Sequence, residues 1–308
     1  MPITVILNPA SARGKTHQQW PQLDQALQAK LGHVDYLETN APRHATQLTR
    51  QALTQGADWI FAVGGDGTLN EVVNGFFSPE GDLINPQARL SVLMSGTGSD
   101  FVRTLNHPSK ALDALPHILQ AEPRQIDLGY AYLGDDLGQR HYFINIASFG
   151  LGGAVIHRLQ NTQYYQKING KAAFLLSTLE SLARFKSKPV RLCIDDAFTL
   201  TTRIQQVVIA NGQFQGGGMK IAPQARLDDG YFDILILEDQ PLLPTLHAFS
   251  KVYQGTHLSS GLLRHFRARK LEVKPLSQDV PQLEVDGETP GRLPARFEIL
   301  QQAIWFQG

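Results

Sequence analysis

The sequence predicts a mixed α/β protein of two domains, the first built on a parallel sheet and the second on antiparallel strands. Strand and helix signals alternate through the first 120 residues, whereas short alternating runs dominate after about residue 125. The chain has 308 residues, 42% of them hydrophobic, which is enough for two cores. We place the domain boundary near residues 125–130.

Four runs rich in β-branched and aromatic residues predict the strands of the first domain. These runs cover residues 3–7, 34–37, 59–63 and 90–94. Helices are predicted between them, at 16–31, at 42–55 and from about residue 68. Pro42 falls in the first turn of the second helix, where proline is tolerated. Repeated βα units of this kind predict a parallel sheet with helices on both faces.

The second half of the chain predicts antiparallel strands joined by polar turns. The alternating runs cover residues 140–147, 189–194, 204–210, 231–237 and 269–274. Clusters such as Asp195-Asp196 and Asp228-Asp229-Gly230 separate many of them, as in a mostly β domain. Two helices are expected to interrupt it, near 170–185 and 241–253.

Composition excludes several classes of protein. Lysine plus arginine equals aspartate plus glutamate at 28 each, so we expect no nucleic-acid partner. The N-terminal residues lack the positive charge and long apolar run of a signal peptide, and no stretch of about 20 residues is apolar enough to span a bilayer. The single cysteine, Cys193, fits a reducing compartment. We therefore expect a cytoplasmic protein whose membrane contact is peripheral.

A glycine-rich turn, Gly64-Gly65-Asp66-Gly67-Thr68, joins the third predicted strand to a helix. Its glycines let the backbone approach a ligand closely, and the helix directs N–H groups and its positive dipole end toward the turn. The turn is therefore a candidate phosphate site. A plain tight turn in which Asp66 or Thr68 caps the helix is the structural alternative.

Two other turns follow predicted strands, Asn8-Pro9 and Gly96-Thr97-Gly98. The carboxyl ends of parallel strands share one edge of a sheet, where ligands bind, so the three turns predict one crevice. Residues 9–16 resemble a P-loop, but Pro9 replaces its first glycine and supplies no N–H. We reject a P-loop and expect Ser11, Arg13 and Lys15 either to contact a nucleotide loosely or to form an ordinary turn.

The segment WIFAVGGDGTLNEVVNG, residues 59–75, resembles the signature of the diacylglycerol kinase catalytic domain. That superfamily includes bacterial lipid kinases and sphingosine and ceramide kinases, with NAD kinases as distant relatives. The resemblance covers essentially the whole chain. Further motifs follow in the family's order: Asn8-Pro9, residues 95–101, Asn211-Gly212 with Gly216-Gly217-Gly218 and Ala222-Pro223, residues 228–233, and residues 285–288. One departure is Ser99, where the family usually has asparagine.

The resemblance implies a Rossmann-like nucleotide domain over 1–127 with about 296–308, and a β-sandwich lipid domain over 128–295, with the active site in the cleft between them. It implies that the glycine loop holds ATP. The implied nucleotide residues are Asn8, Ser11, Thr39 (or its neighbour Asn40), Gly64, Gly65, Asp66, Gly67, Thr68, Leu69, Asn70 and Thr97.

Phosphoryl transfer needs positioning, charge neutralisation by Mg²⁺ and a group that accepts the proton of the attacking hydroxyl. Asp286 and Glu288 flank a glycine and would share one face if the segment were extended. The resemblance assigns the base to this motif, and we name both carboxylates with a slight preference for Asp286. A hairpin turn with solvated acids is the alternative. Asp66 is expected to contact Mg²⁺ or a phosphate-bound water.

Two further features are expected in the second half. The resemblance implies a structural Mg²⁺ held by Asp229 and the carbonyls of Arg226 and Tyr231. The basic run at 264–270 would contact anionic headgroups, or else form a strand with one solvated basic face.

The sequence therefore predicts an ATP-dependent lipid kinase that phosphorylates the hydroxyl of a diacylglycerol-like lipid at a membrane surface. A kinase for a soluble hydroxyl substrate, as NAD kinases are, is one alternative. A non-catalytic regulator is another, although the chain keeps every acidic candidate, which argues against it. The sequence does not name the lipid, and a homodimer stays open.

Overall fold

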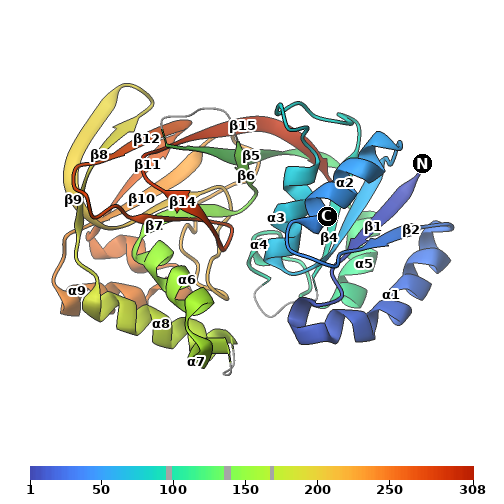
Figure 1. Ribbon diagram of the computed structural model, residues 1–308, viewed down its shortest axis with the longest axis horizontal. Coiled ribbons are helices and arrows are strands. Elements are labelled where there is room, and N and C mark those ends of the chain that lie inside the picture. Colours follow the sequence, from blue (N-terminus) through green and yellow to red (C-terminus); the bar gives the residue numbers. More distant parts are fainter. Residues whose placement is uncertain (95–98, 135–139, 167–169) are drawn as a thin grey trace. The chain divides into compact units, whose positions relative to one another are not determined.

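The computed structural model describes residues 1–94, 99–134, 140–166 and 170–308 (Figure 1). The chain forms two compact units. The first contains Met1–Leu128 together with Gln301–Gly308, and the second contains Gly129–Leu300. The chain leaves the first unit in strand β5 and returns to it in strand β15.

The first unit is built on a parallel sheet of strand order β2-β1-β3-β4-β15. The strands are β1 (Ile3–Leu7), β2 (Asp35–Glu38), β3 (Trp59–Gly64), β4 (Arg89–Met94) and the end of β15 (Ala295–Phe306). Strand β1 lies between β2 and β3, with Val5 opposite Phe61. Phe306 lies opposite Leu90, so the last residues of the chain complete this sheet.

Helices cover both faces of this sheet (Figure 1). On one face, α1 (Lys15–Leu31) and α5 (Ala111–Gln120) bury their apolar side chains against β1, β3 and β4. On the other, α2 (His44–Thr54) packs against α3 (Asp66–Gly75), so closely that a Cβ on Gly75 would lie 2.5 Å from Thr49 Cβ. Short helical segments complete the unit: η1 (Ser11–Gly14) and α4 (Asp100–Thr104). The α/β prediction for this half is confirmed.

The strand pairs of the second unit are antiparallel, as predicted. Its strands are β5 (Arg124–Leu133), β6 (His141–Phe143), β7 (Ile146–Gly150), β8 (Lys188–Ile194), β9 (Phe198–Ala210), β10 (Phe232–Glu238), β11 (Leu263–Ala268), β12 (Lys270–Pro275), β13 (Gln282–Val285), β14 (Glu288–Arg292) and most of β15. The first half of β9 pairs with β8 and its second half pairs with β7 and β10. This long strand therefore joins two groups of strands around one core.

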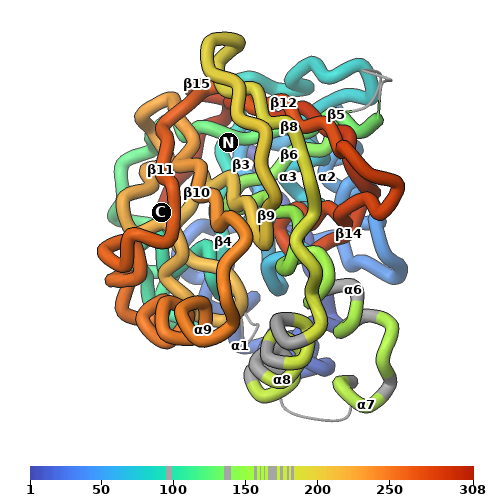
Figure 2. Tube along the Cα trace, turned by 90° about the vertical axis from the view of Figure 1, so that its left-hand side faces the viewer, coloured from blue at the N-terminus to red at the C-terminus, as the bar shows by residue number. Residues whose placement is uncertain are grey.

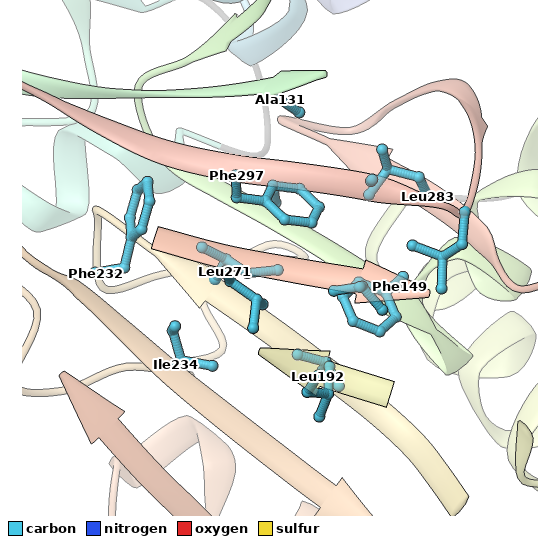
Figure 3. Close-up of a cluster of buried hydrophobic side chains, with 14 of the residues drawn as sticks. Ala131, Phe149, Leu192, Phe232, Ile234, Leu271, Leu283 and Phe297 are labelled. Carbon is cyan, nitrogen blue, oxygen red and sulfur yellow. The ribbon is translucent and has the colours of Figure 1, made fainter. Parts of the chain in front are cut away.

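Alternate side chains of these strands fill that core. Figure 3 shows aromatic and aliphatic side chains from separate strands directed into a shared interior. Phe149, Phe232 and Phe297 are completely buried there. Burial of one such side chain contributes about 1.5–3 kcal/mol, so this cluster is the main apolar contribution to the second unit.

Helices gather at one end of the second unit (Figure 2). They are α6 (Leu151–Asn161), α7 (Gln163–Gln166), α8 (Gly170–Arg184), α9 (Leu242–Ser250), η2 (Val252–Gln254) and η3 (His257–Ser260). The sequence predicted α8 and α9 but missed α6. Gly152 and Gly153 lie in its first turn, where a Cβ on Gly153 would collide with the Gln282 carbonyl. Glycine is unfavourable inside a helix, so Gly152 and Gly153 suggest a loop, yet the missing side chain of Gly153 is what lets α6 approach β13.

Candidate active site

The end of β1 and the start of α3 meet at the carboxyl edge of the parallel sheet. The Asn8 N–H donates to the Val63 carbonyl at 2.9 Å, and the Asn8 side chain donates to Thr68 Oγ1 at 2.9 Å. The Asn8 side-chain oxygen accepts the Ala10 N–H at 3.1 Å. Two predicted nucleotide residues, 60 positions apart, therefore form one hydrogen-bonded unit.

The glycines at 64 and 65 have different surroundings. A Cβ on Gly64 would lie 2.5 Å from Thr68 Oγ1 and 2.7 Å from Thr68 Cβ, so only glycine fits. A Cβ on Gly65 would meet nothing within 4 Å. Gly65 is also the residue before α3, so the structural alternative, a cap by Asp66 or Thr68, is wrong because both lie inside the helix. The N-terminus of α3, whose first N–H groups and dipole favour anions, begins directly after Gly65, which suits a phosphate.

Glu71, later in the same motif, has a structural role that the sequence did not reveal. Its carboxylate accepts the N–H groups of Arg43 at 2.8 Å and Ala45 at 3.1 Å. Helix α2 begins at His44, so Glu71 caps that helix from a neighbouring one. A carboxylate at a helix N-terminus is stabilised by the N–H donors and the dipole.

The other predicted nucleotide residues differ in position. Thr39 follows β2 and donates its N–H to the Leu7 carbonyl at 2.8 Å, so it shares the edge with Asn8. Ser11 donates its hydroxyl to the Asn8 carbonyl at 2.9 Å. Leu69 is 1% exposed and packs in the core, whereas Asn70 is half-buried on α3. Gly67 lies in the first turn of α3, and Thr97 lies outside the described residues.

Ser99 stands in the left-handed region, with φ of 50°, directly before α4. Asparagine tolerates this backbone conformation better than serine does. Ser99 therefore occupies a strained backbone position, which an asparagine would adopt at a lower cost.

The acidic motif of the second unit is a tight hairpin turn. Val285 pairs with Glu288, and the two residues between them have positive φ, 47° at Asp286 and 90° at Gly287. These values match the type I′ hairpin turn. The segment is therefore not extended, and the hairpin turn that the sequence analysis gave as the alternative is the one the structure forms.

The carboxylate of Asp286 anchors this turn to another connection. It accepts the backbone N–H groups of Ile144 at 2.9 Å, Asn145 at 3.1 Å and Ile146 at 2.9 Å. Glu288 begins β14 and is exposed. The two predicted catalytic carboxylates thus lie in contrasting surroundings, one bound by backbone and one in solvent.

A third carboxylate, Glu284, was missed by the sequence analysis. It lies on β13 and is 1% exposed. Burial raises the pKa of Glu284 to about 7, while hydrogen bonds from Ser148 and Gly287 oppose that rise and the nearby Asp286 charge adds to it. The Ser148 hydroxyl donates to Oε2 at 2.7 Å, and the Gly287 N–H donates to Oε1 at 2.6 Å. Glu284 therefore holds the centre of the acidic turn.

An apolar pocket lies within the second unit, on the outer face of β9 and β10 and beneath α6, α8 and α9. Polar groups are few among its lining residues, which include Thr178, Gln206, Gln215, Thr245 and His257. The apolar lining residues are Leu151, Val155, Val208, Met219, Ile221, Leu235, Leu237, Ala248, Phe249, Val252 and Leu263. Burial lowers the pKa of His257, so a neutral imidazole lines the wall. Such a pocket suits a hydrocarbon chain with little polar character.

Comparison with known proteins identifies the family. Residues 2–131 match the diacylglycerol kinase catalytic domain, and residues 145–306 match the YegS C-terminal NAD kinase beta sandwich-like domain. A diacylglycerol kinase of Staphylococcus epidermidis is 30% identical over 301 residues, which cover 97% of this chain and 90% of that protein. The chain belongs to the diacylglycerol kinase family. It is therefore a phosphotransferase that uses ATP.

Solved structures agree with the family in fold. A Bacillus anthracis protein assigned to the diacylglycerol kinases has a TM-score of 0.77 at 22% identity, over 99% of this chain and 94% of that one. Yeast NADH kinase in complex with NADH has a TM-score of 0.52 at 13% identity, over 99% and 82%. These likenesses support the predicted α/β domain followed by a β-sandwich. No helix in the described part of the chain is long and apolar enough to cross a membrane.

The family resemblance implies a structural Mg²⁺ at Asp229 and the carbonyls of Arg226 and Tyr231, and the structure shows what the Asp229 carboxylate contacts. The Asp229 carboxylate accepts the Tyr231 N–H at 3.1 Å and the Arg267 guanidinium at 2.5 Å. Both of its oxygens already have donors, and a cation already neutralises its charge. The Asp229 carboxylate therefore takes part in an ion pair with Arg267, and Mg²⁺ binding at Arg226, Asp229 and Tyr231 stays a prediction.

The basic run at 264–270 forms most of β11, in agreement with the strand interpretation. Arg264 pairs with Glu238, Arg267 with Asp229, and Lys270 with Asp196. Arg267 and Arg269 also lie 4.9 Å from the Tyr231 ring. These pairings neutralise much of the cluster, so its charges offer less to anionic headgroups than the sequence suggests.

Proposed function

We propose that this chain transfers the γ-phosphate of Mg·ATP to the hydroxyl of a diacylglycerol-like lipid. The observation that supports a lipid is the apolar pocket. This pocket lies next to the acidic turn, because Gln215, one of its lining residues, donates to Glu284 at 2.6 Å, and Glu284 accepts the Gly287 N–H. An acyl chain in this pocket would bring its headgroup near the acidic turn. A soluble dinucleotide would gain little from such a wall.

The phosphate end of the reaction belongs to the first unit. We place the ATP phosphates at the open side of Gly65 and the first turn of α3, where N–H groups and the helix dipole favour anions. Asp66 lies in that turn and would contact the Mg²⁺ of Mg·ATP or a phosphate-bound water. Asn8 and Thr68 fix the neighbouring backbone through their side-chain hydrogen bond.

The hydroxyl end belongs to the second unit, so the proposed reaction needs residues of both units. Asp286 and Glu288 remain the two candidates for accepting the hydroxyl proton. The three N–H groups that donate to the Asp286 carboxylate fix its position on the turn. A loose phosphoryl-transfer transition state needs positioning more than a strong base, so this arrangement is compatible with catalysis.

The test is transfer of labelled γ-phosphate from Mg·ATP to a panel of lipids in mixed micelles. Glu288→Gln removes an exposed carboxylate, and we expect a loss of about 10²–10⁴-fold in kcat if it accepts the proton. Asp286→Ala is expected to abolish turnover while ATP binding persists. Glu122→Gln, the same change at an exposed position in the first unit, is the matched control and should keep full activity.

The outcomes separate the competing functions. Labelled lipid that disappears in the Asp286 and Glu288 variants would support the proposed kinase and name its substrate class. If no lipid is labelled but nucleosides or sugars tested in the same assay are, the acceptor would be a soluble hydroxyl compound instead of a lipid. Full activity in both variants would remove the acidic turn from the chemistry.

A further inference from the structure

Three consecutive glycines form a loop in the second unit that the proposed chemistry does not use. Gly216, Gly217 and Gly218 have φ of 67°, 83° and 111°, which side-chain-bearing residues rarely adopt. The residues at the two ends bond each other twice, Gln215 N–H to Met219 carbonyl at 3.0 Å and the reverse at 3.1 Å. Both end side chains line the apolar pocket. The loop therefore fixes a piece of the pocket wall.

One side chain of this wall reaches out of the pocket. The Gln215 amide donates to Glu284 Oε2 at 2.6 Å, and the other carboxylate oxygen accepts the Gly287 N–H at 2.6 Å. Because Glu284 is buried, these hydrogen bonds act where water cannot replace them. A continuous path of two hydrogen bonds thus joins the pocket wall to the centre of the acidic turn.

We propose that Gln215 and Glu284 couple occupation of the apolar pocket to the position of the acidic turn at Asp286-Gly287-Glu288. This inference rests on the proposed lipid kinase function. An acyl chain that fills the pocket presses on the wall and holds Gln215 against Glu284, which holds Gly287. The substrate class is then a hydroxyl lipid with chains long enough to reach Gln215. Both residues are positioning residues.

The consequence is selectivity in kcat rather than in KM alone. Binding energy from a remote part of a substrate can be used to position the reacting groups, so a truncated substrate loses kcat. The chains of a short-chain diacylglycerol do not reach Gln215, so Gln215 is not held against Glu284. Such a substrate should have a low kcat even at saturating concentration. The chain also offers a matched control, because Ser148 donates to the same Glu284 oxygen but does not line the pocket.

The test compares kcat for dioctanoylglycerol and dioleoylglycerol in mixed micelles. We expect a kcat advantage of about tenfold for the longer chains in the wild type. Gln215→Met keeps the shape and loses the donor, so the advantage should fall to about one while the KM for ATP is unchanged. Ser148→Ala should keep the advantage. Lipid turnover with the same advantage in Gln215→Met would overturn the coupling and leave the kinase function standing.

A second measurement does not depend on turnover. Hydrogen exchange of the peptide containing Gly287 is followed with and without dioleoylglycerol micelles in the absence of ATP. We expect slower exchange with lipid in the wild type and in Ser148→Ala, and no change in Gln215→Met. Exchange that lipid does not alter in the wild type would overturn the coupling, whereas absence of labelled lipid in the transfer assay would instead overturn the kinase function.

Discussion

Glu284 shows how one buried carboxyl group organises a turn. Three donors, from Ser148, Gln215 and Gly287, offset part of the cost of removing its charge from water. The offset is incomplete, since burial still raises its pKa to about 7. Glu284 therefore fixes the geometry of the turn at Asp286-Gly287-Glu288, and its burial lowers the free energy of unfolding near neutral pH.

The raised pKa predicts how stability depends on pH. The folded state binds this proton more tightly than the unfolded state, so the wild type loses unfolding free energy as pH rises from about 4.5 through 7. The loss is about 3 kcal/mol, since one pKa unit corresponds to about 1.4 kcal/mol. Glu284→Gln does not titrate and should not show it. Urea unfolding followed by circular dichroism gives the unfolding free energy of both proteins at pH 5 and at pH 8.5. If the difference in unfolding free energy between wild type and Glu284→Gln were the same at the two pH values, the prediction would be contradicted.

Sequence alternation explains why Glu284 escaped notice. Leu283 and Val285 point into the core. Because successive side chains of a strand point to opposite faces, Glu284 lies on the other face of β13, which in a β-sandwich is expected to face solvent. That face is covered instead, where α6 packs against β13. Asp286 was named from its motif, but its three hydrogen bonds reach residues 140–142 positions away, which no local pattern reveals.

At the scale of elements, the junction of β3 and α3 combines folding and function in adjacent glycines. Gly64 lies against Thr68, whereas Gly65 faces open space. Gly64→Ala should lower the free energy of unfolding by about 1–3 kcal/mol, because the added methyl group overpacks a tight contact. Gly65→Ala should leave stability nearly unchanged and weaken ATP binding, because its methyl group enters the proposed phosphate site.

Urea unfolding and calorimetric ATP titration on the two variants separate these effects. Equal stability losses in both would show that the junction is purely structural. Unchanged ATP affinity in a folded Gly65→Ala protein would remove the phosphates from this side of the helix.

Elements with strong local signals were predicted well, and those set by tertiary contacts were not. The strands at 59–63 and 90–94 were placed within one residue, because continuous apolar runs between turn signals define them. Helix α6 was missed, because its glycines are required by close approach to β13 rather than by the helix itself. The hairpin at Asp286 was offered only as an alternative, since aspartate followed by glycine also suits a type I′ turn.

At the scale of the whole molecule, the chain's end belongs to the unit in which it begins. The Ser91 hydroxyl donates to the Gln307 carbonyl, and the Phe306 ring packs edge-on against Phe101 with centroids 5.7 Å apart. The family resemblance suggested this return, but composition and periodicity gave no sign of it, because a terminal apolar strand can join any open sheet edge. The first unit is therefore completed only after the second has been synthesised.

Phe306→Ala tests this arrangement. The ring is 1% exposed, and removing a buried phenyl group costs about 3–5 kcal/mol. All three tryptophans, Trp20, Trp59 and Trp305, lie in the first unit, so tryptophan fluorescence reports the unfolding of that unit alone. The variant should shift this transition to lower urea and weaken ATP binding, because the sheet edge that carries Asn8 and Gly64 loosens with the sheet. Phe198→Ala, at a ring 43% exposed in the second unit, is the control and should leave the fluorescence transition in place. An unshifted transition in Phe306→Ala would mean that β1 to β4 form a stable sheet without the returning strand.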